Sequence, residues 1–101
     1  MIEVKYDRSK RSLKVTGHAG YAEHGKDIVC SAASALFNTA AAALSAMDAA
    51  KTDISVDEQG AYLAYTGKSG GKAQVILDVI CRGYMILQSE YPNNVKVEGW
   101  T

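Results

Sequence analysis

The sequence predicts an α+β fold, in which a mostly antiparallel sheet of about five strands is covered on one face by two helices. Short segments of alternating apolar and polar residues occur in pairs separated by polar or glycine-containing turns, as expected for hairpins with one buried face. Two longer segments with apolar residues at helical spacing follow these pairs. The resulting order, ββαββαβ, favours helices on one face of an antiparallel sheet.

The first hairpin is expected near the N-terminus. Apolar residues alternate with polar ones over 2–7, a polar turn covers 8–11, and the alternation resumes over 13–16. Period-two alternation predicts strands that are buried on one face. Gly17 and His18 follow directly, so the histidine is expected at a strand end entering a loop, where functional side chains are common.

The first helix is expected over about 28–50, a segment rich in alanine. Asp27 immediately precedes it and is the natural N-cap, which puts Cys30 in the first turn. Ser34 and Asn38 follow Cys30 at intervals of four and should lie beside the apolar stripe. The stripe itself is expected to pack on the sheet and contains Ile28, Val29, Ala32, Ala33, Leu36, Phe37, Ala40, Ala41, Leu44 and Met47.

A second hairpin is expected over 53–65, with a turn at 58–60 in which Gly60 is expected to have a positive φ. The strand after this turn has apolar residues on both faces, which suits a central strand or one covered by a partner subunit. The second helix is expected over 72–91. Cys81 lies on its core stripe and is interpreted as a packed thiol.

Three features complete the predicted fold. Pro92 ends the second helix, a short final strand is expected over 95–97, and Trp100 is expected to close one edge of the core. Val79 and Ile86 lie off the helical stripe. They are expected to be scattered surface residues or part of a dimer contact.

Composition narrows the functional classes. A chain of 101 residues is expected to form one domain over 1–101. The formal net charge is zero, so nothing indicates electrostatic capture of nucleic acid. We expect no signal peptide and no apolar stretch long and unbroken enough to cross a bilayer. A reduced, cytoplasmic compartment would suit a working thiol.

No metal or cofactor is expected. The two cysteines are far apart in the chain, which argues against a disulfide framework or a zinc site. The Gly-Lys-Ser sequence at 67–69 lacks the upstream glycine of a phosphate-binding loop, since Tyr62 stands at that position.

The stretch from Gly17 to Cys30 carries the candidate chemistry. A first-turn position gives Cys30 nearby backbone N–H groups and the positive end of the helix dipole, which favour the nucleophilic thiolate. His18 is placed to take the thiol proton or to pair with the thiolate as imidazolium. Asp27 is placed to cap the helix, to orient His18, or to do both. From residue types alone, a packed cysteine is the commoner outcome.

The surroundings of Cys30 leave further roles open. Ser34 is placed to hydrogen-bond the thiolate or the backbone carbonyl four residues earlier. The loop over 19–26 carries Gly20 and Gly25, which permit unusual dihedral angles. It is either a plain connector or a mobile flap that orders over substrate or supplies part of an oxyanion hole.

Gly17-His18-Ala19, followed across the loop by Gly25-Lys26-Asp27-Ile28-Val29-Cys30-Ser31-Ala32-Ala33-Ser34-Ala35-Leu36, resembles the Prp family, the ribosomal-processing cysteine proteases (also called YsxB-like). The signature of that family is Gly-His, a short Gly-rich loop and then Gly-x-Asp-Ile-Val-Cys-Ala-Ala-x-Ser. Two positions depart from it. Ser31 stands where the family commonly has Ala, and His24 stands where an aromatic such as Tyr is expected, adding an imidazole near the site.

The resemblance implies a homodimeric cysteine endopeptidase that removes an N-terminal extension from a large-subunit ribosomal protein during ribosome assembly. It implies that Cys30 is the nucleophile, that His18 transfers protons, and that Asp27 and Ser34 orient or cap. The implied partner is the ribosomal protein precursor, with no direct contact to nucleic acid or membrane. The substrate loop and oxyanion region would contain Gly17, Gly20 and Gly25.

Two other classes stay open. One is a thiol-dependent enzyme that is not a protease, such as an acyltransferase or a redox enzyme. Redox chemistry would want a resolving cysteine, and Cys81 is poorly placed for that in the predicted helix. The other is a non-catalytic ribosome-assembly binding module in which Cys30 is packed.

Overall fold

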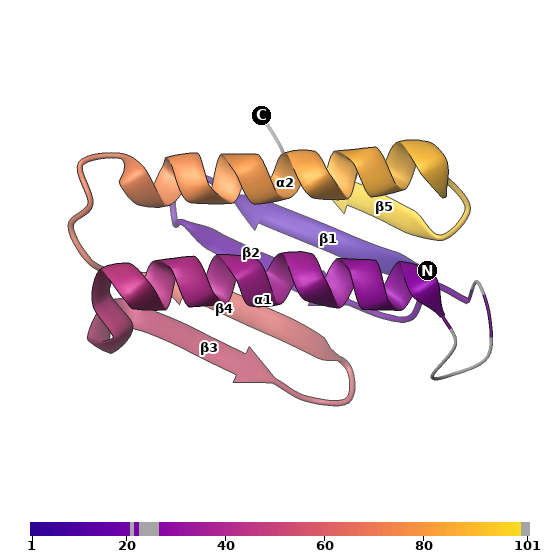
Figure 1. Ribbon diagram of the computed structural model, residues 1–101, viewed down its shortest axis with the longest axis horizontal. Helices are drawn as coiled ribbons and strands as arrows, with labels where there is room; N and C mark the ends of the chain where they lie inside the picture. The colour runs from indigo at the N-terminus through magenta and orange to yellow at the C-terminus, as the bar shows by residue number, and fades with distance from the viewer. Residues whose placement is uncertain (21, 23–26, 100–101) are drawn as a thin grey trace.

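The computed structural model describes residues 1–20, 22 and 27–99. One layer is a five-stranded sheet, and two helices cover one of its faces (Figure 1). The predicted α+β class is therefore confirmed. In chain order the elements are β1 (Ile2–Asp7), β2 (Ser12–Thr16), α1 (Ile28–Asp48), a 3₁₀ turn (Ala49–Lys51), β3 (Thr52–Val56), β4 (Gly60–Tyr65), α2 (Lys72–Glu90) and β5 (Val95–Glu98).

The strands lie in the order β3-β4-β2-β1-β5. The two hairpins join through antiparallel pairing of β2 with β4, which places Leu13 opposite Leu63. Among the strands of the described residues, only β5 and β1 pair in parallel, with Val4 opposite Val97. β4 is thus a central strand, the first of the two options that its apolar faces predicted, while β3 and β5 form the edges of the sheet.

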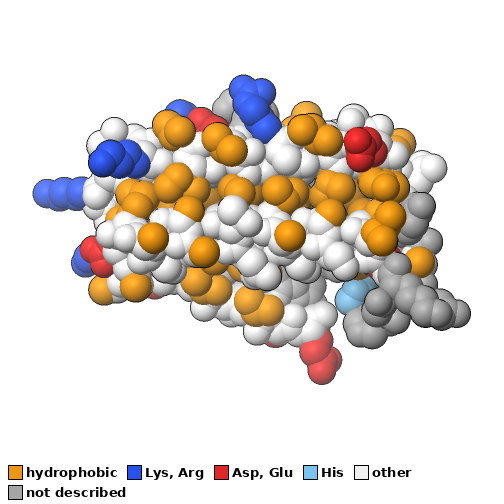
Figure 2. Space-filling model, in the orientation of Figure 1, with side chains coloured by type: hydrophobic (Ala, Val, Ile, Leu, Met, Phe, Trp, Pro, Cys, Tyr) orange, Lys and Arg blue, Asp and Glu red, His pale blue; other side chains and the backbone are white. Residues whose placement is uncertain are grey.

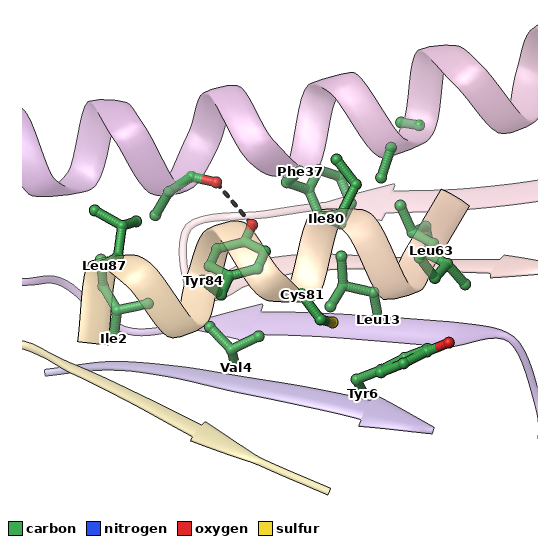
Figure 3. Close-up of a cluster of buried hydrophobic side chains, with 14 of the residues drawn as sticks. Ile2, Val4, Tyr6, Leu13, Phe37, Leu63, Ile80, Cys81, Tyr84 and Leu87 are labelled. Carbon is green, nitrogen blue, oxygen red and sulfur yellow. Dashed lines mark hydrogen bonds between the residues drawn. The ribbon is translucent and has the colours of Figure 1, made fainter. Parts of the chain in front are cut away.

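The core lies between the helices and the sheet (Figure 3). Val4, Leu13 and Leu63 from three neighbouring strands are each 0 % exposed. Cys81 of α2 is also 0 % exposed, and burial raises its pKa to about 12, which bears out its interpretation as a packed thiol. The Tyr84 hydroxyl donates a 2.7 Å hydrogen bond to a backbone carbonyl of α1 and thereby ties the two helices together.

Both helices end slightly earlier than predicted. α1 stops at Asp48, whose side chain accepts a hydrogen bond from the Ala50 N–H and starts the 3₁₀ turn. An aspartate competes with the helix for its own backbone donors, which explains the break. α2 ends at Glu90, because Tyr91 leaves helical geometry with φ of −129°.

Two single-residue predictions are wrong. Gly60 does not have a positive φ. Instead, a Cβ at Gly60 would collide with the Val15 carbonyl oxygen of β2, so the glycine permits close approach of the strands and not a special turn. Ile28 was expected in the packed stripe but is 56 % exposed, whereas its neighbour Val29 is 0 % exposed, because successive helical residues point in different directions and only Val29 of the two faces the core.

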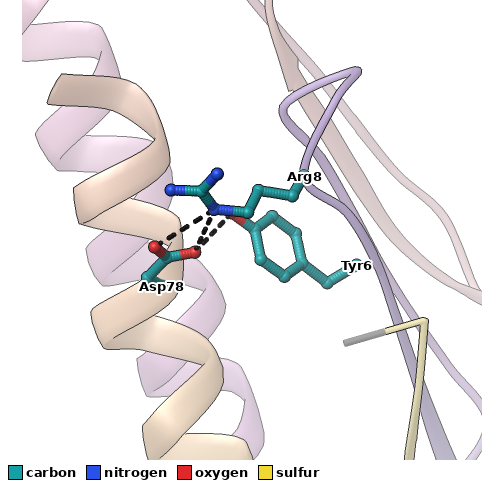
Figure 4. A network of polar contacts seen from close by, with 3 residues as sticks. All are labelled: Tyr6, Arg8 and Asp78. Atoms are coloured by element: carbon teal, nitrogen blue, oxygen red, sulfur yellow. Dashed lines mark hydrogen bonds and ion pairs between the residues drawn. The ribbon is translucent and has the colours of Figure 1, made fainter. Parts of the chain in front are cut away.

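A polar cluster connects α2 to β1 (Figure 4). The Tyr6 hydroxyl donates a 2.8 Å hydrogen bond to Asp78, and the Arg8 guanidinium lies 3.2 Å from the same carboxylate. Partial burial opposes ionisation of Asp78, but the hydrogen bonds from Tyr6 and Arg8 outweigh it and hold the pKa of Asp78 below its usual range. Burial and the bond to Asp78 raise the pKa of Tyr6.

One expectation about membranes needs correction. The segment Ile28–Lys51 is long and apolar enough to cross a bilayer by length and composition, with a mean hydropathy of 1.5. The sequence pattern hid this hydropathy because the segment owes it largely to alanine and contains no unbroken run of large apolar side chains. In the fold, one side of this helix packs into the core through residues such as Val29, Phe37 and Leu44.

Candidate active site at the start of α1

Cys30 lies in the first turn of α1, and Asp27 fixes the geometry of that turn. The Asp27 carboxylate accepts hydrogen bonds from the N–H groups of Val29 and Cys30, both at 3.0 Å. It is 7 % exposed, and its second oxygen accepts a 3.4 Å bond from the Ala22 N–H. This is the predicted N-cap. The same carboxylate also ties the loop before the helix to the turn that carries the thiol.

The loop after β2 reaches Cys30 through its backbone. The N–H of Ala19 donates to the Cys30 Sγ at 3.3 Å. The carbonyl of Ala19 accepts a 2.7 Å hydrogen bond from the side-chain amide of Asn94, just before β5. Ala19 is itself 3 % exposed. The peptide groups around Ala19 are therefore held on both sides, and one of their donors points at the sulfur.

Gly17 sets the direction in which the chain leaves β2 and enters this loop. Its N–H donates a 3.1 Å hydrogen bond to the Gln59 carbonyl in the β3–β4 hairpin. Its φ is +88°, and a Cβ there would collide with the carbonyl oxygen of Met1, so only glycine fits. His18, the next residue, is exposed and lines the same cleft as Cys30. The structure thus brings the predicted Cys–His pair to one cleft.

The cleft has a volume of about 820 Å³ and is partly open to solvent. One wall is α1, where Ser34 and Asn38 lie one and two turns beyond Cys30. The opposite wall is the hairpin between β3 and β4, including Asp57 and Glu58. A cleft of this size, lined by a thiol and bounded by a helix and a hairpin, can hold part of an extended peptide chain.

The remaining predicted site residues divide into two groups. Gly20 lines the cleft with φ of +67°, and Ser34 lines it without a side-chain hydrogen bond to any described residue. The two alternatives for Ser34, bonding to the thiolate or to its own helix, are therefore both absent in this conformation. Gly25 and His24 lie outside the described residues, as does Trp100.

Sequence reasoning missed Asn94 and the Ala19 peptide. The main-chain donor at Ala19 has no signature of its own, because any non-proline residue supplies an N–H group. Asn94 is 75 positions away from its partner. The one local signal was an asparagine pair directly before the final strand pattern, which is also typical of a simple turn.

Known proteins match this chain over nearly all of its length. A family model described as cysteine protease Prp matches residues 1–96. The chain is 26 % identical over 102 residues to the ribosomal processing cysteine protease Prp of Bacillus subtilis, covering 95 % of this chain and 91 % of that protein. It is 29 % identical over 98 residues to the protein of the same name from Staphylococcus aureus, covering 95 % and 92 %.

Solved structures show the same fold. The crystal structure of Prp from S. aureus with a covalently linked product peptide superposes with a TM-score of 0.81 at 22 % identity, over 98 % of this chain and 97 % of that one. The crystal structure of SMU.848 from Streptococcus mutans gives a TM-score of 0.74 at 27 % identity, over 99 % and 92 %. With the family model matching almost the whole length, this chain belongs to the Prp family of cysteine proteases.

Proposed function

We propose that this protease removes the N-terminal extension of a large-subunit ribosomal protein during ribosome assembly, with Cys30 as nucleophile and His18 as general base. One observation carries the site assignment. The Cys30 Sγ, in the first turn of α1, accepts an N–H from the loop that presents His18, and both side chains line one cleft. The substrate class is supported by relatives named as ribosomal processing proteases and by solved relatives bound to substrate and product peptides.

The proposed reaction is acyl transfer through a thioester. His18 takes the thiol proton as the Cys30 sulfur attacks the carbonyl carbon of the scissile peptide bond. The tetrahedral intermediate collapses, and the imidazolium of His18 gives its proton to the departing amine. Water then attacks the thioester, losing a proton to His18, and releases the carboxylate product together with the free thiol. Cys30 is half-buried and lines the cleft, so its sulfur is within reach of a chain that lies there.

The oxyanion donor is assigned to the loop and not to the helix. The N–H groups of Val29 and Cys30 are already bonded to the Asp27 carboxylate, so they are not available to a developing oxyanion. The Ala19 N–H instead reaches the position beside the sulfur at 3.3 Å. Once the sulfur has bonded to the carbonyl carbon it loses its negative charge and becomes a weaker acceptor, so this donor is free to bind the oxyanion of the tetrahedral intermediate. Asp27 thus acts as a positioning residue for the turn.

We also propose a cytoplasmic homodimer that contacts neither nucleic acid nor membrane. Figure 2 shows hydrophobic side chains gathered over the helical layer. Val75, Val79 and Ile86 of α2 are 60 %, 63 % and 59 % exposed, and their spacing puts them on one helix face. A second copy would cover this stripe. The formal net charge of zero supports the absence of contact with nucleic acid. A working thiol supports a reduced, cytoplasmic compartment.

The test is cleavage of the purified ribosomal protein precursor from the same genome, followed by mass spectrometry of the new N-terminus. Cys30→Ala should abolish cleavage with an unchanged fold, because alanine suits a helix. His18→Ala should lower turnover by roughly 10²–10⁴-fold, and His24→Ala is the matched control. If the precursor stays intact with wild-type protein while Cys30 alkylates no faster than a buried thiol, the binding-module alternative replaces this proposal.

A further inference from the structure

The β3 strand presents an unpartnered edge to solvent. β3 pairs only with β4 among the described strands. Two backbone bonds show which opposed residues of this ladder are hydrogen-bonded to each other. The Asp57 N–H donates to the Gly60 carbonyl at one end, and the Thr66 N–H donates to the Lys51 carbonyl at the other. Because hydrogen-bonded pairs alternate along an antiparallel ladder, Ile54 and Val56 direct their N–H and C=O groups away from β4. These groups form a free template for another strand.

The side chains of this edge are also uncovered. Ile54 is 47 % exposed and Val56 is 67 % exposed, although their register places both on the face of the sheet that carries the helices. Natural proteins normally protect such edges with charges, proline or a covering segment. An apolar and unpaired edge is therefore expected to have an occupant.

The edge is continuous with the active-site cleft. Val56 lines the cleft together with Cys30 and Asn38. Figure 1 shows β3 running beside α1, with its arrowhead directed toward the end of the molecule where α1 begins. An extended chain that lies along β3 would consequently lead straight into the groove that holds the thiol.

Charge argues against a second copy as the occupant. Every charged residue over 52–60 is acidic, namely Asp53, Asp57 and Glu58. Antiparallel self-pairing that uses both Ile54 and Val56 would put Asp53 of one copy opposite Asp57 of the other. Like charges directly opposite one another destabilise a strand pair. A strand carrying basic side chains is the electrostatically favoured partner.

We propose that the part of the peptide substrate flanking the scissile bond binds as an added sixth strand on β3, hydrogen-bonded to the main chain of Ile54 and Val56. This inference rests on the proposed function and adds its mode of substrate recognition. Main-chain pairing supplies affinity in such strand addition, and alternate side chains supply specificity. The acidic hairpin of Asp57 and Glu58 favours basic residues in the flanking segment.

The experiment uses a synthetic peptide that spans the processing site of the ribosomal protein precursor, with N-methyl groups introduced one position at a time. Methylation should raise KM at every second flanking residue and be tolerated at those between, because alternate N–H groups of an added strand face β3. On the protein, Ile54→Pro removes an outward N–H without disturbing β4 pairing. It should raise KM by roughly fivefold, as expected for one lost hydrogen bond.

Ile54→Ala is the matched control, since it shortens the side chain but keeps the N–H group, and it should raise KM less than the proline does. Alkylation of Cys30 should be unchanged in both variants. Introducing lysine into the peptide flank should lower KM, and introducing glutamate there should raise it, because Asp57 and Glu58 are both acidic.

Three outcomes overturn the proposal. If the parent peptide is cleaved but the methylation series shows no alternation, strand addition is wrong while the proposed function stands. If Ile54→Pro alters the oligomeric mass and leaves KM unchanged, the edge belongs to a second copy. If the parent peptide is not cleaved although Cys30 alkylates rapidly, the proposed function fails and the docking mode falls with it.

Discussion

Replacing Asn94 should lower the reactivity of the Cys30 thiol, although Asn94 acts on it only through Ala19. The Asn94 side chain donates to the Ala19 carbonyl at 2.7 Å, and the N–H of Ala19 donates to the Cys30 Sγ at 3.3 Å. Asn94→Ala removes the first of these bonds and leaves the second without support. The backbone bonds of Asn94, which accept from Ile2 and donate to Tyr91, remain in the variant, so β5 should stay paired.

The size of the effect follows from the burial of the partner. Ala19 is 3 % exposed, and a buried carbonyl that loses its donor costs about 1–3 kcal/mol. If that cost falls on the loop conformation that faces the sulfur, the competent fraction declines by roughly 5- to 150-fold, since about 1.4 kcal/mol corresponds to a factor of ten. The decrease should appear in kcat/KM.

Peptide cleavage and iodoacetamide alkylation of Cys30 at neutral pH measure this loss together. Asn93→Ala is the matched control, because Asn93 is the exposed neighbour in the same turn. Asn94→Asp keeps the size but lacks the N–H donor, so it should behave like Asn94→Ala. The reasoning is refuted if Asn94→Ala retains kcat/KM and an alkylation rate within twofold of wild type.

Three further predictions concern the scaffold. Tyr84→Phe removes the 2.7 Å bond to the Ala33 carbonyl and should lower the free energy of unfolding by about 1–2 kcal/mol in urea titrations; an unchanged midpoint would contradict it. Cys81, with its pKa raised to about 12 by burial, should resist alkylation in the native protein and react fully in denaturant, as peptide mapping would reveal. The pKa of Asp78 is lowered on folding, so its carboxylate stabilises the fold above about pH 4, and that contribution is lost as pH falls through the folded value. The stability difference between wild type and Asp78→Asn should therefore shrink below about pH 4, and a constant difference would argue against the assignment.

The local elements of the fold were predictable because each rests on a short-range pattern. Alternation over 2–7 and 13–16 and helical spacing after Asp27 depend on neighbours in sequence. The order of strands was not predictable in this way. Nothing in the alternation of β5 specifies parallel pairing with β1, and nothing in β4 names β2 as its partner, because these choices depend on how the helices pack across the sheet.

In the candidate site, too, the local features were predictable from sequence and the long-range contacts were not. Asp27 and Cys30 could be placed from sequence because a cap and a first turn are defined within four residues. Their proximity to His18 followed from the short connecting loop. The contacts that hold the site from outside, Ala19 to the sulfur and Asn94 to Ala19, join backbone or distant groups and therefore leave no periodic trace.

The contact between Asn94 and Ala19 also has a consequence for synthesis. A ribosome makes Ala19, the loop residue whose N–H contacts the thiol, 75 residues before it makes the asparagine that holds the loop in place. At usual elongation speeds, that interval lasts several seconds or longer. During it, the nascent chain carries a cysteine without its ordered neighbour. The chain would thus emerge with its candidate nucleophile unsupported, and the contact could form only when β5 docks beside β1.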